Sequence, residues 1–87
     1  MTETQILETI RQFIIDNYPK ARQGELQEDD KLLEKGIIDS LGLFTLIEFL
    51  EMTFEIKVSG SDVTEDKFAS IQTLIIFVNE LLSKNSE

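Results

Sequence analysis

Apolar residues recur at helical spacing in three stretches of this 87-residue chain. The first stretch predicts a helix over residues 3–17, in which Ile6, Ile10 and Ile14 follow the spacing of a helix that buries one side. Pro19 should end this helix, because proline disfavours helical geometry at the residue before it.

The second stretch predicts a helix from Ser40 or Leu41 to about Phe54. At a turn of about 100° per residue, its core side holds Leu43, Leu46, Ile47, Leu50 and Phe54. The opposite side carries two apolar and three acidic residues, which are Leu41, Phe44, Glu48, Glu51 and Glu55. Such a face is either a solvated acidic surface or a docking surface. The two apolar side chains favour a docking surface.

The third stretch predicts a final helix that Ser70 caps and whose buried face is formed by Ile71, Leu74, Ile75, Val78, Leu81 and Leu82. Before it, Asp62 and Glu65 have the spacing of a capping box, which predicts a short helix through about Lys67. Residues 83–87 should form a frayed tail. These elements predict an all-α fold, a small four-helix bundle with a long loop between helices 1 and 2 and a short helix 3.

The long loop runs from Tyr18 to Asp39 and is rich in charge. Asp29 or Asp30 could cap a short turn that Gly36 closes. Four apolar residues should pin the loop to the core, namely Leu32, Leu33, Ile37 and Ile38.

Composition narrows the chemistry that the chain can perform. Its length allows a single domain, residues 1–87. The chain contains no cysteine and no histidine, so it lacks disulfides, thiolate metal ligands and the usual base for a serine nucleophile. We therefore expect neither a metal site nor an enzyme.

The charge balance points to the kind of partner. Seventeen acidic and eight basic residues give a net charge of −9, which repels nucleic acids and anionic lipids and favours basic protein partners. No run approaches the length of apolar sequence that spans a membrane, and the N-terminal residues lack the features of a signal peptide. The expectation is a cytoplasmic protein without nucleic-acid binding or membrane insertion.

Residues 36–41, Gly-Ile-Ile-Asp-Ser-Leu, place one serine where the long loop becomes the second helix. Either Asp39 or Ser40 could cap that helix, because both residue types accept hydrogen bonds from the free N–H groups of a first turn. Ser40 is therefore either a structural cap or a working hydroxyl.

This segment and the helix after it resemble the phosphopantetheine attachment site of acyl carrier proteins and of the related aminoacyl and peptidyl carrier domains. The similarity runs from about Asp29 to Leu82. It includes the runs Asp-Lys-Leu-Leu-Glu-Lys-Gly at 30–36, Glu-Ile-Lys-Val at 55–58 and Phe-Ala-Ser-Ile at 68–71.

The resemblance implies that a phosphopantetheinyl transferase recognises Asp39 and moves 4′-phosphopantetheine from coenzyme A onto the Ser40 hydroxyl. The arm would carry an acyl or aminoacyl group as a thioester, and the protein would be a monomeric carrier in biosynthesis. A loading ligase and downstream transferases would dock on the outer face of the second helix, through Leu41, Phe44, Glu48, Glu51 and Glu55.

Three positions distinguish this chain from carriers of fatty-acid synthesis. Thr45 and Met52 stand where those carriers typically place acids, and Gly42 weakens the first turn of the helix. The chain is more similar to stand-alone carriers of specialised pathways, such as aminoacyl or D-alanyl carriers that an adenylating ligase loads.

Alternatives remain at the level of sequence. The chain could be an unmodified helical adaptor whose acidic second helix binds a basic partner. A small serine enzyme is disfavoured, because no histidine base is present. Phe49, Phe68 and Ile71 either line a slot for a carried chain or, as is commoner for such residues, pack the core.

Overall fold

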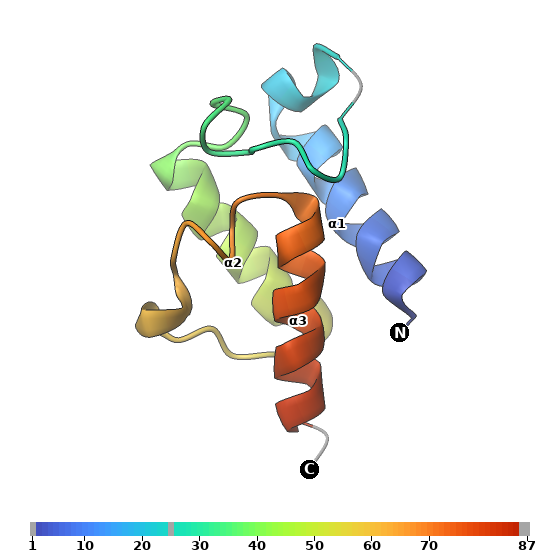
Figure 1. The fold of residues 1–87 in the computed structure, drawn as a ribbon, viewed down its shortest axis with the longest axis vertical. Helices are drawn as coiled ribbons and strands as arrows, with labels where there is room; N and C mark the ends of the chain where they lie inside the picture. Colours follow the sequence, from blue (N-terminus) through green and yellow to red (C-terminus); the bar gives the residue numbers. More distant parts are fainter. Residues whose placement is uncertain (1, 25, 86–87) are drawn as a thin grey trace.

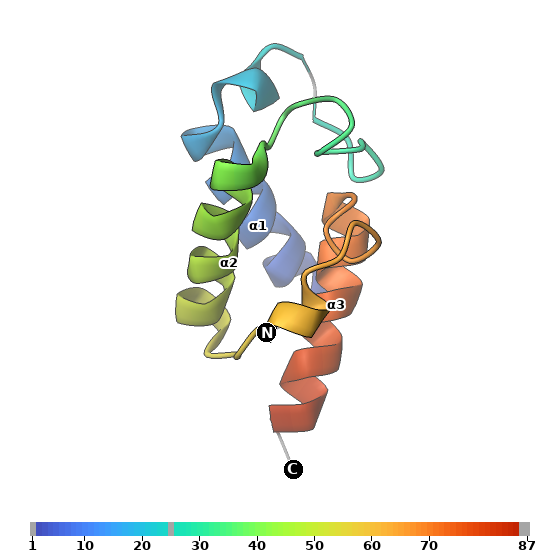
Figure 2. The ribbon, with the colours of Figure 1, turned by 90° about the vertical axis from the view of Figure 1, so that its left-hand side faces the viewer.

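The computed structural model describes residues 2–24 and 26–85, and in these ranges it contains helices and no strands. Its elements in chain order are α1 (Glu3–Asn17), the 3₁₀ turn η1 (Pro19–Arg22), α2 (Ser40–Phe54), the 3₁₀ turn η2 (Gly60–Asp62) and α3 (Ile71–Asn85). In the view of Figure 1, α3 lies between α2 and α1, whereas in the turned view of Figure 2 α1 lies between α2 and α3. The all-α prediction is confirmed.

Helix α1 has the bounds that the apolar spacing predicts. Thr2 and Gln5 form a capping box at its start, in which each side chain accepts a hydrogen bond from the other residue's backbone N–H. The helix ends at Asn17, and its C-cap Tyr18 has an extended backbone ahead of Pro19.

One apolar core joins the three helices. Ile6, Ile10 and Ile14 of α1 are fully buried. Helices α2 and α3 contribute further buried side chains, Leu46, Leu50, Phe54, Ile71, Leu74, Ile75, Phe77 and Val78. Full burial of such a side chain contributes about 1.5–3 kcal/mol, so this core accounts for the packing of short helices that would be marginal alone.

Helix α3 begins with a reciprocal pair of hydrogen bonds, because Ser70 and Thr73 each accept from the other's backbone N–H. Phe68 and Ile71 are buried in the core, and Phe68 packs edge-on against Phe77 at 5.5 Å between ring centroids. Core packing is thus the interpretation that the structure favours for Phe68 and Ile71. Phe49 instead stacks on Phe13 at the edge of the core, 3.8 Å between centroids.

The described residues contain three α-helices, so the predicted four-helix count is not confirmed. The short helix expected from Asp62 to about Lys67 is replaced by η2 and a turn at 65–68. The reason lies in Asp62, whose carboxylate accepts from both the backbone N–H and the hydroxyl of Ser59. Asp62 therefore closes the turn behind it and does not cap a helix ahead of it.

Helix α3 continues through Ser83 and Lys84 to Asn85, beyond the point at which the sequence predicts fraying. Residues 86–87 of that predicted tail lie outside the described residues. No helix of the described ranges is long and apolar enough to cross a membrane.

Candidate functional site

The long loop lies over the end of the molecule at which α1 ends and α2 and α3 begin (Figures 1 and 2). Leu32 pins it there, because its side chain is fully buried and its N–H donates to the carbonyl of Ala69 at 2.8 Å. The N–H groups of Ile37 and Ile38 both donate to the Leu32 carbonyl. A left-handed backbone at Gly36, with φ of 70°, permits this tight return.

As predicted, the pinning residues Leu32 and Ile38 are buried, and Leu33 and Ile37 are half-buried. An ion pair between Lys35 Nζ and Asp30 Oδ1, 2.7 Å apart, closes the loop at the surface. The pKa of the Asp30 carboxyl is lowered by this hydrogen bond. These contacts hold the loop in place up to the point where α2 begins.

Asp39 is the cap of α2, and Ser40 is the first residue of the helix. The Asp39 Oδ1 atom accepts from the Gly42 N–H at 2.7 Å, and the Asp39 carbonyl accepts from the Leu43 N–H at 2.8 Å. Ser40 is exposed, and its hydroxyl makes no hydrogen bond to another described residue. Asp39 therefore takes the capping role, and the Ser40 hydroxyl is left without a structural bond among the described residues.

Tyr18 reaches from the end of α1 to the first turn of α2, where its hydroxyl donates to the Gly42 carbonyl. The ring lies so close to Gly42 that a Cβ atom there would come within 2.7 Å of the tyrosine Cε1. Burial, and to a lesser degree the nearby Asp39 carboxylate, raises the pKa of the Tyr18 phenol above its ordinary value.

The sequence does not predict this contact. Its pattern marks Gly42 only as a weak point of the helix, whereas in the structure the glycine makes room for the Tyr18 ring. Nothing in the spacing of Tyr18 and Gly42, 24 residues apart, identifies them as partners.

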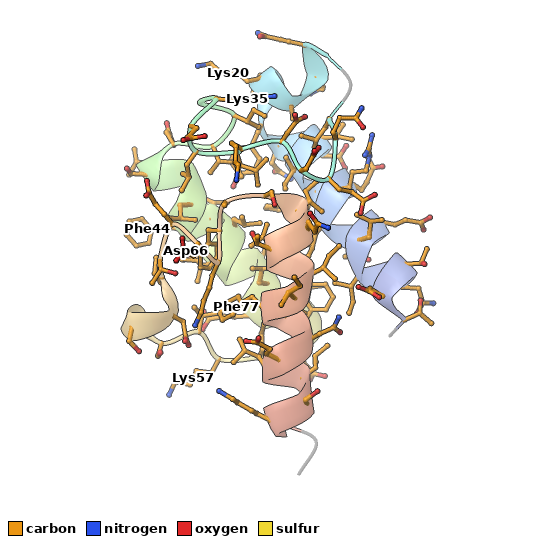
Figure 3. All side chains as sticks on the ribbon, viewed as in Figure 1. Lys20, Lys35, Phe44, Lys57, Asp66 and Phe77 are labelled. Carbon is orange, nitrogen blue, oxygen red and sulfur yellow. The ribbon has the colours of Figure 1, made fainter. Side chains whose placement is uncertain are left out.

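The outer face of α2 exposes three large apolar side chains. Leu41 is 78% exposed, Phe44 is 64% exposed and Met52 is 81% exposed. Figure 3 shows Phe44 projecting outward at the edge of the molecule. Met52 was not among the predicted docking residues, although its helical spacing from Leu41 places it on the same outer face.

The three predicted acids of this face differ in their surroundings. Glu48 and Glu55 are exposed. Glu51 is half-buried, and its Oε2 atom accepts from the Val58 N–H at 3.0 Å. Glu51 thus ties the chain after α2 back onto the helix, a role that the sequence pattern did not indicate.

The start of α2 is suited to hold a phosphate on a serine oxygen. Within the described residues the N–H groups of Ser40 and Leu41 have no acceptor, and they stand at the positive end of the helix dipole. The chain has no histidine to act as a base, and the described residues hold no group of three acids arranged to bind a metal ion. The site can therefore present a hydroxyl but has no usual group with which to activate it.

Comparison with known proteins agrees with this arrangement. No family model matches the chain. It is 32% identical over 75 residues to the D-alanyl carrier protein of Streptococcus pyogenes serotype M5 (strain Manfredo), a match that covers 84% of this chain and 95% of the relative. The D-alanyl carrier protein of Streptococcus uberis (strain ATCC BAA-854 / 0140J) matches with the same identity and coverage.

Among solved structures, the chain resembles one from a crystal structure described as an FAD-dependent dehydrogenase, with a TM-score of 0.73 and 26% identity. The match covers 80% of this chain and 99% of the other, so the matched chain is itself small. The four glycines of the present sequence do not form the Gly-x-Gly-x-x-Gly motif of dinucleotide-binding folds.

Proposed function

Since the chain belongs to the family of carrier proteins that bear an acyl or aminoacyl group on a phosphopantetheine arm, we propose that Ser40 is the residue to which the arm is attached. The observation that carries this proposal is the division of roles at the start of α2. Asp39 caps the helix, and the neighbouring Ser40 hydroxyl is exposed and makes no hydrogen bond to a described residue. As a carrier, the protein is not an enzyme.

The fit of the group rests on the first turn of α2. A phosphate on the Ser40 oxygen would stand at a helix start, where the N–H groups of Ser40 and Leu41 and the helix dipole favour an anion. The Asp39 carboxylate opposes it by charge, but its Oδ1 is already engaged by the Gly42 N–H. When bound, the arm supplies a thiol on which the acyl group is held as a thioester.

Attachment requires a separate phosphopantetheinyl transferase. The Ser40 oxygen forms a new bond to the phosphorus of coenzyme A that bears the pantetheine, and the bond from that phosphorus to the nucleotide part breaks. The Ser40 proton passes to a base of the transferase, because this chain has no histidine, and the transferase also supplies Mg²⁺. The carrier's own contribution is to hold its hydroxyl in a fixed and accessible place.

Asp39 is proposed as a feature that the transferase recognises. The substitution Asp39→Asn tests this role, because asparagine caps a helix about as well as aspartate while it removes the charge. We expect slower modification at unchanged stability. An unchanged modification rate would leave Asp39 with its capping role alone.

Partner enzymes are proposed to dock on the outer face of α2. Leu41, Phe44 and Met52 supply exposed apolar area, and Glu48 and Glu55 supply charge that steers basic partners. Glu51 was predicted to join them, and its bond to Val58 means that only part of its charge is offered to a partner. Reversal of Glu48 to Lys should slow association at low salt more than it alters folding.

The carried group is proposed to be a small aminoacyl group, with D-alanine as the first candidate, because the curated relatives are D-alanyl carrier proteins. In this proposal an adenylating ligase loads the arm and downstream transferases unload it. The protein acts as a monomer in the cytoplasm, where coenzyme A and the ligase's nucleotide substrate are available.

A second candidate reaction of the carried group, its oxidation, is favoured by one observation. The chain resembles a small chain from a structure described as an FAD-dependent dehydrogenase. In that case a separate flavoenzyme would oxidise the group while it remains on the arm, and the flavin would be reduced. Loading assays separate the two cases, because a D-alanyl pathway requires a ligase that prefers D-alanine over other amino acids.

Intact mass spectrometry tests the proposal. The protein is incubated with coenzyme A, Mg²⁺ and a broad-specificity phosphopantetheinyl transferase, beside Ser40→Ala and the control Ser61→Ala, which removes another exposed serine. We expect one phosphopantetheine increment in the wild type and the control and none in Ser40→Ala. Addition at another residue would move the attachment site, and no addition to a folded wild type would favour the adaptor.

A further inference from the structure

The first turn of α2 is held at Gly42 from two sides. The Gly42 N–H donates to Asp39 Oδ1 at 2.7 Å, which is a contact within the turn itself. The Gly42 carbonyl accepts from the hydroxyl of Tyr18, which comes from the end of α1. A first helical turn otherwise tends to fray, since its N–H groups lack partners within the helix. The tyrosine therefore supplies a restraint that α2 does not have by itself.

Tyr18 is itself firmly placed. Its backbone N–H donates to the Ile14 carbonyl at 3.0 Å, and its own carbonyl accepts from the Ala21 N–H at 2.9 Å. Its ring is buried and meets the edge of Phe13, with 6.0 Å between the ring centroids. A side chain held in this way connects the end of α1 rigidly to Gly42, two positions after Ser40.

We propose that Tyr18 is a positioning residue for Ser40, which fixes the first turn of α2 so that the serine hydroxyl meets the transferase in one orientation. The inference rests on the proposed attachment at Ser40. Tyr18 acts through the Gly42 carbonyl and does not itself touch the reacting oxygen. Gly42 belongs to the same arrangement, because a larger residue at this position would collide with the Tyr18 ring.

Tyr18→Phe is the direct test, since it removes the hydroxyl and keeps the ring. The matched control is Ile10→Val, which trims the buried core of α1 away from the Tyr18–Gly42 contact and destabilises by a comparable amount. Phosphopantetheine transfer from coenzyme A is measured with Mg²⁺ and the transferase, together with the melting temperature of each variant.

For Tyr18→Phe we expect a fall of about twofold to tenfold in kcat, the size expected for one hydrogen bond, with little change in KM. Ile10→Val should keep the wild-type kcat despite its lower melting temperature. Equal losses in the two variants would make the effect one of general stability and overturn the positioning role. A kcat for Tyr18→Phe equal to that of the wild type would also overturn it.

The design separates this proposal from the one on which it rests. A wild-type protein that gains no mass contradicts attachment itself, whereas a labelled wild type matched by Tyr18→Phe contradicts only positioning. A second readout needs no variant, because Tyr18 is the one tyrosine of a chain without tryptophan. Its ionisation can be followed by near-ultraviolet absorbance.

If Tyr18 holds the turn that carries Ser40, a phosphodiester on the serine should raise the midpoint of the tyrosine titration further, because a nearby anion disfavours the phenolate. The apo and modified forms of the wild type are compared. A higher midpoint in the modified form supports the coupling, and identical midpoints overturn it.

Discussion

The two ends of α2 are built differently. At its start, Asp39 caps the helix and Tyr18 grips the Gly42 carbonyl from α1. At its end, the chain leaves through Glu55, a residue other than glycine in the left-handed conformation with φ of 53°. The Glu51 carboxylate ties the departing chain at Val58. One end is held by favourable contacts from two elements, and the other closes on an unfavourable backbone conformation.

Charge adds to the contrast. The acid at the start of α2 stands at the positive end of the helix dipole, where it is stabilising. The last turn contains no basic residue, and three acids, Glu48, Glu51 and Glu55, lie in the second half of the helix or at its end. The difference indicates that stabilising contacts are concentrated at the start of α2, beside Ser40. The C-terminal end of the helix has not been optimised for stability.

The largest effect should come from Gly42→Ala. Helix propensity alone predicts a gain of about 1 kcal/mol from this change. The new Cβ would lie 2.7 Å from Tyr18 Cε1 and 3.2 Å from Asp39 Oδ1, so we expect instead a loss of about 1–3 kcal/mol in the free energy of unfolding. Urea denaturation measures it.

Gly60→Ala is the control for that substitution, because no atom lies within 4 Å of a Cβ built there. Its stability should stay within about 0.5 kcal/mol of the wild type. A Gly42→Ala protein more stable than the wild type would show that the ring yields readily, and the contrast between the ends of α2 would lose its main support.

The next effect concerns the tie at the far end of α2. Glu51→Ala removes the acceptor of the Val58 N–H, and we expect a loss of about 1 kcal/mol in unfolding free energy. Glu48→Ala removes the same charge one turn earlier without a hydrogen bond among the described residues, so it should be nearly neutral. Equal effects in the two variants would assign the loss to charge and not to the bond.

A gain in stability should follow from Glu55→Gly. The left-handed conformation costs about 1–2 kcal/mol for a residue with a Cβ, and the entropy of glycine offsets part of the relief. We expect a net gain of about 0.5–1 kcal/mol and a higher melting temperature. Glu48→Gly, inside the same helix, should lose about 1 kcal/mol. A loss in both variants would mean that the backbone at Glu55 is not a weak point.

Much of the fold could be predicted from the sequence because it depends on local rules. The spacing of apolar residues and the position of Pro19 correctly predicted the bounds of α1. The apolar stripe of the second helix correctly predicted the bounds of α2. The short helix after Asp62 was wrong because two residues compete to begin an element there. The Asp62 carboxylate accepts hydrogen bonds from Ser59. It therefore does not accept from the Glu65 N–H, as the capping-box pattern predicted.

The candidate site was predictable only in part for the same reason. Ser40 and Asp39 are neighbours in the sequence, and their motif predicts both as site residues. The Tyr18–Gly42 contact and the bond from Glu51 to Val58 depend on how separate segments meet in space. Such contacts leave no periodic pattern in the sequence. The motif could therefore nominate Ser40, but it could not predict that Tyr18 and Gly42 hold the first turn of α2.

The smallest predicted effect concerns the segment after α2, which relies on polar contacts at the surface, both exposed and half-buried. The Asp62 carboxylate pairs with Lys67 Nζ at 3.0 Å, and this contact, with the bonds from Ser59, lowers the pKa of Asp62 below its ordinary value of 3.8. A carboxyl with a lowered pKa in the folded protein stabilises the fold above the unfolded value and loses that contribution as the pH falls through the folded value.

Asp62→Asn should therefore flatten the acid side of the stability profile. The melting temperature of the wild type is expected to fall more steeply than that of the variant below about pH 4, and the two profiles should run parallel at neutral pH. Asp66→Asn is the control, because Asp66 makes no hydrogen bond to another described residue. The difference should be small, since ion pairs near the surface are weak and screened by salt. A steep difference would mean that this segment supports the fold as firmly as the start of α2 does, and the contrast between the two ends would fail.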